Sequence, residues 1–132
     1  MRPKGPKQCY DFFGVSYKNI QWSWSGRSRE KVAVTLWQDR FIDGGKAYEQ
    51  WPEDKPGEWK SRPGFVELIE NLAFARDELD GIVHVIIAKA KDKSASPRAI
   101  ETSFPSKMLM KIVSLDENEG KFRLEATDSA AF

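Results

Sequence analysis

The residues whose chemistry stands out in this sequence are tryptophans on one short stretch of chain. Trp22 and Trp24 stand two residues apart, and Trp37 follows after a polar turn. Indole rings stack on flat heterocycles, and each stacked base contributes about 1–3 kcal/mol. The pattern therefore indicates a site for a planar ligand, with a nucleic-acid base as the first candidate. The alternative is that these rings belong to the core, because tryptophan is highly buried on average.

Small polar and basic residues accompany these rings. Hydroxyls and carboxylates can read the edge of a base, and arginine and lysine can hold phosphates. The residues that we expect to stack on a base or read its edge are Trp22, Trp24, Trp37, Trp59, Ser23, Ser25 and Asp39. The residues that we expect to contact phosphates are Lys18, Arg27, Arg29, Arg40 and Lys107.

The sequence offers little for catalysis. His84 is the only histidine and Cys9 the only cysteine, so a zinc site or a Cys–His pair is unsupported. We interpret His84 as a structural residue of a strand. A minor alternative is a metal-dependent nuclease using Asp54, Glu58 and Lys60, because carboxylates with a lysine can hold Mg²⁺ and position a water. We expect no cofactor, no bound metal, and binding rather than catalysis.

The tryptophans need a β-hairpin to position them. Residues 20–25 and 32–38 favour strands, and the polar residues 26–31 between them predict the turn. Side chains alternate along a strand, so Trp22 and Trp24 share one face of the first strand. On the return strand we expect one face to carry Val32, Val34 and Leu36, and the other to carry Ala33, Thr35 and Trp37.

The rest of the chain predicts one helix and three more strands. Apolar spacing of three and four indicates the helix over residues 64–80, with Pro63 in its first turn and Gly81 after its end. The strands are expected at 82–90, 108–115 and 121–126, with loops at 42–62 and 91–107. The fold class is therefore α+β: a small, mostly antiparallel β-barrel or a strongly twisted sheet of about five strands with one main helix.

Length and charge limit the possibilities further. The 132 residues predict a single domain with a flexible arm at 1–8 and a frayed tail at 127–132. Neither a signal peptide nor an apolar run of membrane-spanning length is visible, and the single cysteine suits a reducing cytoplasm. The net charge is +1, but residues 1–31 carry seven basic against two acidic residues, and residues 63–81 carry one against five. This indicates a basic face and an acidic back, or else an ordinary solvated surface.

The order of elements resembles the PUA-like superfamily, which includes EVE, ASCH, YTH-like and SRA-like domains. The stretches that carry the resemblance are Trp22-Ser23-Trp24-Ser25, Leu36-Trp37-Gln38-Asp39 and the closing hairpin 108–126. It implies a small pseudo-barrel that binds RNA or DNA and takes a modified base into an aromatic pocket, in a setting such as bacterial or phage defence. The Lys/Thr/Glu constellation expected of catalytic ASCH enzymes is not placed here, which again favours binding.

The main alternative is a protein-interaction module, such as an inhibitor or a homodimer-forming accessory protein. Its contact surface would be the acidic face of the predicted helix or the loop between Tyr48 and Trp59. Exposed tryptophan and arginine are frequent hot spots of protein interfaces. No membrane partner is expected.

Overall fold

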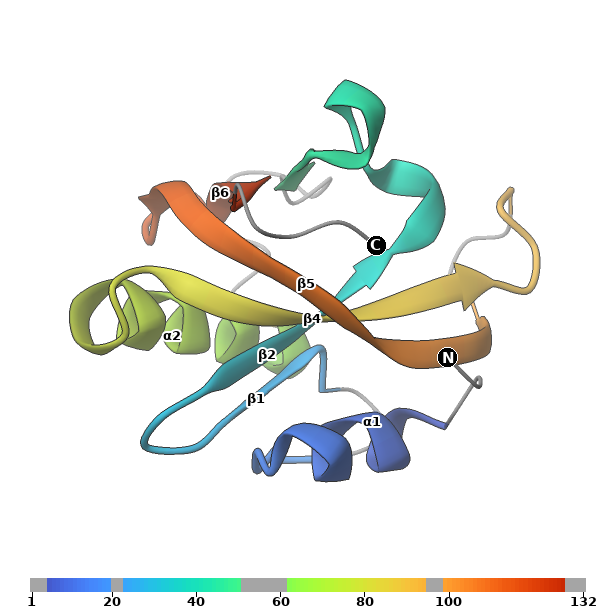
Figure 1. Cartoon of the computed structure of the whole chain (residues 1–132), viewed down its shortest axis with the longest axis horizontal. Helices are drawn as coiled ribbons and strands as arrows, with labels where there is room; N and C mark the ends of the chain where they lie inside the picture. Colours follow the sequence, from blue (N-terminus) through green and yellow to red (C-terminus); the bar gives the residue numbers. More distant parts are fainter. Residues whose placement is uncertain (1–4, 20–22, 51–61, 95–98, 128–132) are drawn as a thin grey trace.

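The computed structural model of the chain describes residues 5–19, 23–50, 62–94 and 99–127. Within these ranges, two α-helices and two 3-10 helices accompany six strands. Figure 1 shows how they are arranged. The helical elements are α1 (Pro6–Phe13), η1 (Gln38–Arg40), η2 (Asp43–Gly45) and α2 (Pro63–Glu78). The strands are β1 (Ser25–Arg27), β2 (Val32–Trp37), β3 (Ala47–Gln50), β4 (Ile82–Ala90), β5 (Ile100–Asp116) and β6 (Lys121–Ala126).

The six strands form one mixed sheet in the order β1-β2-β4-β5-β6-β3. β2 and β4 run parallel, and every other neighbouring pair is antiparallel. The α+β class and the mostly antiparallel sheet are confirmed. The described residues form six strands and two α-helices, where about five strands and one main helix were predicted. The described strands do not close into a barrel. The parallel pair exists because the chain leaves β2, forms β3 and α2, and returns beside β2 as β4.

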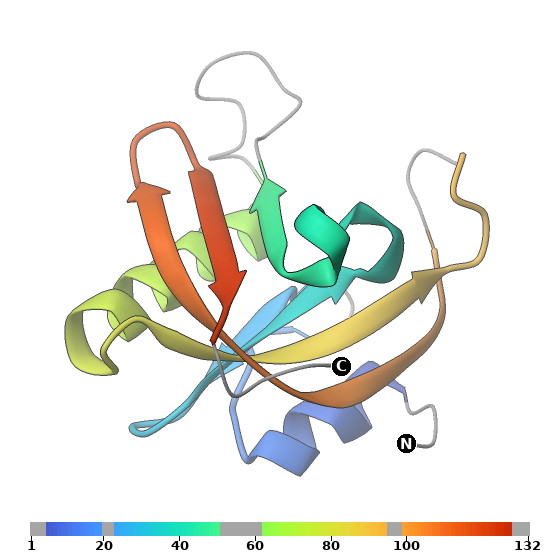
Figure 2. The ribbon, with the colours of Figure 1, turned by 45° about the horizontal axis from the view of Figure 1, so that its top comes forward.

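The two α-helices cover opposite faces of the sheet. On β2, the predicted alternation is confirmed: Val32, Val34 and Leu36 pack in the core cluster beneath α2. Ala33 packs on the other face with Tyr10 of α1. Figure 2 shows α1 on one side of β4, with the β5–β6 hairpin and β3 rising on the other. The sheet is therefore buried on both sides along β2 and β4, as the continuous apolar runs of their sequences require.

The predicted hairpin forms, with a shorter first strand. β1 pairs antiparallel with β2, Ser25 opposite Val34 and Arg27 opposite Val32. The turn is therefore narrower than the predicted 26–31. The backbone before β1 continues the ladder by one bond, since the Thr35 amide donates to the Trp24 carbonyl at 2.9 Å. Residues 20–22 of the predicted first strand lie outside the described residues.

β5 corrects the prediction of a loop at 91–107, because this strand already begins at Ile100. Pro105 suggested a loop, since proline cannot donate to a ladder. In the structure it lies opposite Ile86, beside a register shift in the pairing of β4 and β5 between His84 and Ile86. A bulge of this kind tolerates proline within a strand. Beyond it, β5 bends away to pair with β6, as Figure 1 shows.

Two more regions differ from the sequence prediction. α1 begins at Pro6, so residues 6–8 of the expected arm are helical. Pro6 suits the first helical position, and the Gln8 carboxamide accepts from the Gly5 amide at 3.0 Å. The expected loop 42–62 contains β3, whose partner is β6. At the other end of the chain, the Thr127 amide donates to the Leu109 carbonyl at 3.0 Å, so the tail is held up to that residue.

The prediction of a long helix is confirmed in α2. It begins at Pro63 and ends at Glu78, and the Gly81 amide closes it by donating to the Ala75 carbonyl at 2.9 Å. Gly81 has a φ of 74°, which glycine adopts without strain. No helix in the described part of the chain is both long and apolar enough to cross a membrane.

Strands β2 and β3 approach each other without pairing. The Trp37 amide of β2 donates to the Tyr48 hydroxyl of β3 at 3.3 Å, although four other strand pairings separate these strands in the sheet. On the outer side of β3, Arg123 of β6 holds Asp43 and Glu49 at 3.0 and 3.5 Å. The sheet is thus curved so far that a side chain bridges its open side, and the N-terminus of α2 lies beside the same opening.

Candidate functional site

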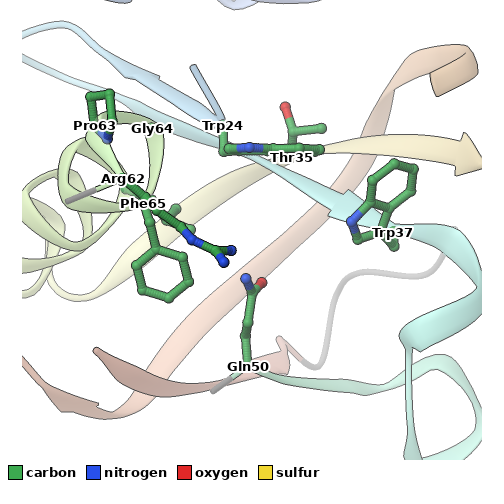
Figure 3. A pocket seen from close by; sticks show the side chains of 9 residues that line it. Trp24, Thr35, Trp37, Gln50, Arg62, Pro63, Gly64 and Phe65 are labelled. Atoms are coloured by element: carbon green, nitrogen blue, oxygen red, sulfur yellow. The ribbon is translucent and has the colours of Figure 1, made fainter. Parts of the chain in front are cut away.

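A pocket of about 390 Å³ lies at this open side of the sheet. Four parts of the chain meet there: the residue before β1, the end of β2, the end of β3 and the start of α2. Figure 3 shows their side chains around one shared space. The lining residues are Trp24, Thr35, Trp37, Gln50, Arg62, Pro63, Gly64, Phe65 and Leu68.

Two tryptophans form the aromatic wall of the pocket. The ring centroids of Trp24 and Trp37 are 5.3 Å apart, and the ring planes are inclined by 54°. Trp37 is 8 % exposed and packs on Ala88 and Ala90 of β4, so its ring is fixed by the sheet. Trp24 is only partly buried and contacts both Trp37 and the core beneath α2. Both interpretations of these tryptophans therefore hold in part, because the rings pack on core residues and also line the pocket.

A buried hydroxyl network supports this wall from behind. The Tyr10 hydroxyl of α1 lies 3.0 Å from the Thr35 hydroxyl and donates to the Ser23 carbonyl at 3.2 Å. Burial raises the pKa of Tyr10 far above its usual range, so the phenol stays protonated. One side chain thus joins Thr35, which lines the pocket, to the residue that precedes Trp24.

The opposite side of the pocket is polar. The Gln50 carboxamide at the end of β3 and the Arg62 guanidinium at the start of α2 both point into the space (Figure 3). Of the nine described residues that line it, Arg62 carries the charge. The pocket therefore combines flat apolar rings with a donor–acceptor amide, a hydroxyl and a positive charge.

The predicted base-reading residues reach the pocket only in part. Trp24 and Trp37 line it, whereas Ser25 is buried against α2, where its hydroxyl accepts from the Asn71 side-chain carboxamide at 2.8 Å. The Ser23 hydroxyl accepts from the Asn19 amide at 3.0 Å and shapes the turn before Trp24. Asp39 is exposed on η1 and does not line the pocket. Trp22 and Trp59 lie outside the described residues.

The five predicted phosphate contacts are exposed and spread over the molecule. Lys18 lies beside α2, where its ammonium group is 3.5 Å from Glu70. The Arg27 guanidinium lies over the Phe74 ring, 4.7 Å from its centroid. Arg29 follows in the hairpin turn and Arg40 ends η1, three residues after Trp37. Lys107 lies on the face of β5 opposite to α2, because its neighbour Met108 packs beneath α2.

This placement limits the predicted separation of charge. Lys18 and Arg27 come from the basic segment 1–31, yet both contact α2, whose outer side is acidic. A second contact joins the segment 1–31 to α2, since the Glu67 carboxylate accepts from the Lys18 backbone amide at 2.8 Å. The basic segment and the acidic helix are therefore neighbours here, and not a face and its back.

Sequence reasoning missed the polar half of the pocket. Gln50 lies within the expected loop 42–62, and Arg62 is the last residue of that loop. The apolar ring beside them, Phe65, belongs to the start of the predicted helix. Nothing in the spacing of these residues states that β3 and α2 face the same tryptophans.

The other residues considered for catalysis or metal binding do not form a site in the described part of the chain. His84 is half-buried on β4 with the Phe13 ring 5.1 Å away, and burial together with Lys31 lowers its pKa. Within the described ranges, no group of three or more His, Cys, Asp or Glu could hold a metal ion. Asp54, Glu58 and Lys60 of the nuclease alternative lie outside the described residues.

Comparisons with known proteins found no relative of this chain. No protein-family model, no curated protein and no solved structure matches the chain. A function is therefore inferred from the pocket and the residues around it.

Proposed function

We propose that this protein binds nucleic acid and holds a single base, plain or modified, in the pocket between Trp24, Trp37 and Phe65. The resemblance to the PUA-like superfamily belongs to the same proposal, and so does a role as a modified-base sensor. The observation that carries it is the pairing of inclined indole rings, 5.3 Å apart, with a carboxamide and a guanidinium in one pocket.

The size of the pocket supports a small planar ligand. At about 390 Å³ it is near the lower end of ligand pockets, which hold roughly 300–1,000 Å³. That space suits one nucleotide better than a large cofactor. A base outside a duplex exposes its faces for stacking and its edges for hydrogen bonding, which are the two kinds of surface that this pocket offers.

The positive charge supports a ligand attached to phosphates. Arg62 brings a guanidinium to the pocket, and Arg40 is exposed after the strand that carries Trp37. Arginine donates in a fixed fork that matches phosphate oxygens as well as base acceptors. A nucleotide would therefore meet a cation whether its base or its phosphate approached this side.

Tryptophan fluorescence during titration with short DNA and RNA strands, plain and base-modified, tests the proposal. Stacking on Trp24 or Trp37 should quench the emission at low salt, and less so at higher salt. A pocket for one base should also respond selectively among oligonucleotides of equal length and charge. No response to any oligonucleotide would contradict the proposal, and light scattering would then test the homodimer reading.

Substitution of the ring that is less buried connects the signal to the pocket. Trp24→Ala should weaken binding by roughly 5- to 150-fold, as expected for the loss of about 1–3 kcal/mol of stacking. Phe12→Ala is the control, because Phe12 is 57 % exposed on α1 and lies outside the pocket. Binding would be measured by fluorescence anisotropy of a labelled strand, with circular dichroism to confirm folding. Equal affinities of Trp24→Ala and Phe12→Ala would place the ligand elsewhere.

A further inference from the structure

We propose that one face of the sheet is a docking surface for an acidic segment of a partner protein, a segment that carries apolar side chains between its carboxylates. The surface is independent of the proposed function, because none of its residues is among the described residues that line the pocket. We call it the basic sheet face and define it by the residues Lys31, His84, Lys107, Leu109, Lys111 and Val113.

The pairing of β4 with β5 brings most of these residues to one side of the sheet. Leu109 lies directly opposite His84, so their two side chains point to the same side. Lys107 and Lys111 stand two residues before and after Leu109 and point the same way, because side chains alternate along a strand. Val113 continues this row at the register shift between β5 and β6. Lysine and an apolar residue therefore alternate along the exposed row of β5.

Helix α1 covers this side of the sheet only in part. Ala33 and Ile86, which pack with α1, are 0 % and 1 % exposed, whereas His84 and Leu109 are only half-buried. Figures 1 and 2 both show α1 apart from the end of β5 that pairs with β6. At that end Val113 is 53 % exposed. A protein partner could remove this apolar surface from water, which favours association.

The lysines of the basic sheet face have no acidic partner in the part of the chain that the structure describes. With other described residues, Lys31, Lys107 and Lys111 form no ion pair. On α1, by contrast, the Lys7 ammonium group lies 2.7 Å from the Asp11 carboxylate. Cations without a carboxylate partner attract an anionic ligand and raise the rate at which it docks.

The neighbours of these lysines do not offset their charge. Glu125 lies opposite Lys111 in the pairing of β5 with β6, but its carboxylate already accepts from the Arg123 guanidinium at 2.8 Å. Burial and the charge of Lys31 lower the pKa of His84, so the imidazole between the lysines is neutral at pH 7. The face is therefore positive through its lysines, with an apolar and neutral surface between them.

This mixture of charge and apolar surface favours a protein segment over a strand of nucleic acid. A phosphate backbone pairs with lysines but brings no apolar side chains to cover Leu109 and Val113. An acidic amphipathic segment brings both, since its carboxylates can meet the lysines while its apolar side chains cover the surface between them. The basic sheet face therefore matches a partner that alternates the same two kinds of side chain.

Selection from a displayed library of random 12-residue peptides on the full chain tests the chemistry of the partner. The selected peptides should be enriched in aspartate and glutamate, and in large apolar residues, relative to the unselected library. Their binding should weaken as the salt concentration rises, because exposed charges are screened. A selection that gives no peptides, or peptides without an excess of acidic residues, would overturn the proposal.

Two variants with matched controls place the selected peptides on the basic sheet face. Lys111→Gln should weaken binding of a labelled selected peptide by about 2- to 5-fold at low salt, as expected for one exposed ion pair. Lys121→Gln is its control, because the Lys121 ammonium group is already paired with Glu119 at 2.9 Å. Fluorescence anisotropy measures the affinities, and circular dichroism confirms that the variants fold.

The second variant, Val113→Ser, should weaken the same peptide by about 3- to 10-fold, because binding would bury the exposed half of a valine side chain. Its control is Ile42→Ser, since Ile42 is 37 % exposed and bridges to Ala47 of β3, on the far edge of the sheet.

Equal affinities of each variant and its control would overturn the docking surface. So would a Lys111→Gln variant that loses affinity for oligonucleotides alone, because the face would then contact phosphates. Neither result would change the outcome of Trp24→Ala, which tests the pocket separately.

Discussion

At the scale of single residues, the hydroxyl of Tyr10 connects the core to the pocket. It touches the Thr35 hydroxyl and the Ser23 carbonyl from a position that is 1 % exposed. A buried polar group that loses its partner costs more than the bond itself contributes, because water cannot replace the partner. The network therefore makes the geometry of Trp24 and Thr35 sensitive to a residue that never reaches the pocket.

Tyr10→Phe should lower the free energy of unfolding by about 1–3 kcal/mol, because it leaves Thr35 and the Ser23 carbonyl without their buried partner. Urea unfolding measures this change. Tyr17→Phe is the control, since Tyr17 is only half-buried and water can reach its ring. A loss for Tyr10→Phe no larger than that for Tyr17→Phe would show that the network contributes nothing to stability.

Because its pKa is lowered in the folded protein, His84 should make the protein less stable at low pH. Burial and the nearby charge of Lys31 lower its pKa from the usual 6.5, so the unfolded chain takes up this proton first as the pH falls. The free energy of unfolding should therefore decrease as the pH falls from about 7.5 through 6.5, and level off below the lowered pKa. In His84→Gln this step should disappear from unfolding curves measured over the same range. A step that remains in the variant would belong to another group.

At the scale of elements, the β1–β2 hairpin is held from outside as well as by its own pairing. Ser16 forms an isolated bridge with Arg27, through backbone bonds of 2.9 and 3.0 Å. The chain after α1 therefore covers β1 on the edge away from β2. Gly26 is the residue that permits this approach, because a Cβ there would lie 2.8 Å from the Ser16 carbonyl oxygen and 2.9 Å from a Val15 methyl group.

Gly26→Ala should destabilise the protein by about 1–3 kcal/mol, the usual cost of forcing extra volume into a packed site. The contact on one side is backbone, so it cannot move aside as a flexible side chain would. Gly5→Ala is the control, because its nearest neighbour would be the Gln8 oxygen at 3.9 Å. Thermal unfolding of both variants measures the difference, and equal melting temperatures would contradict the close approach.

At the scale of the whole molecule, exposed positive charges outside the pocket should control the affinity for nucleic acid. A near-neutral protein that binds nucleic acid relies on local cations, and each phosphate contact releases counterions. Arg27 is exposed on β1, the strand that directly follows Trp24, and lies over Phe74 of α2. Its guanidinium therefore has a defined position on the strand that follows Trp24.

Arg27→Ala should weaken binding and reduce the slope of log affinity against log salt by about 0.7–0.9, the value of one phosphate contact. Arg76→Ala removes the same charge from α2, where Arg76 is paired with Asp77 and Glu117. Titration of one strand at several salt concentrations compares the two. An unchanged slope in Arg27→Ala would remove this residue from the interface.

Local sequence patterns predicted several of the elements correctly. Alternation on β2, the length of α2, the buried strand β4 and the turn before β6 all follow from periodicity and turn residues within a few positions. These features succeed because each depends on neighbours along the chain. The same patterns identified Trp24 and Trp37 as candidate site residues, because aromatic residues on paired strands lie close together.

The other features of the fold depend on long-range packing. The parallel pairing of β2 with β4 and the position of β3 at the far edge depend on where the chain returns, which no local pattern records. Pro105 predicted a loop, yet a bulge against β4 accommodates it within β5. The pocket likewise joins residues 24, 35, 50 and 62, because the curved sheet brings β2, β3 and α2 together at its open side. Contacts between residues far apart in sequence depend on the packing of the whole chain, and so the polar half of the pocket became visible only in the fold.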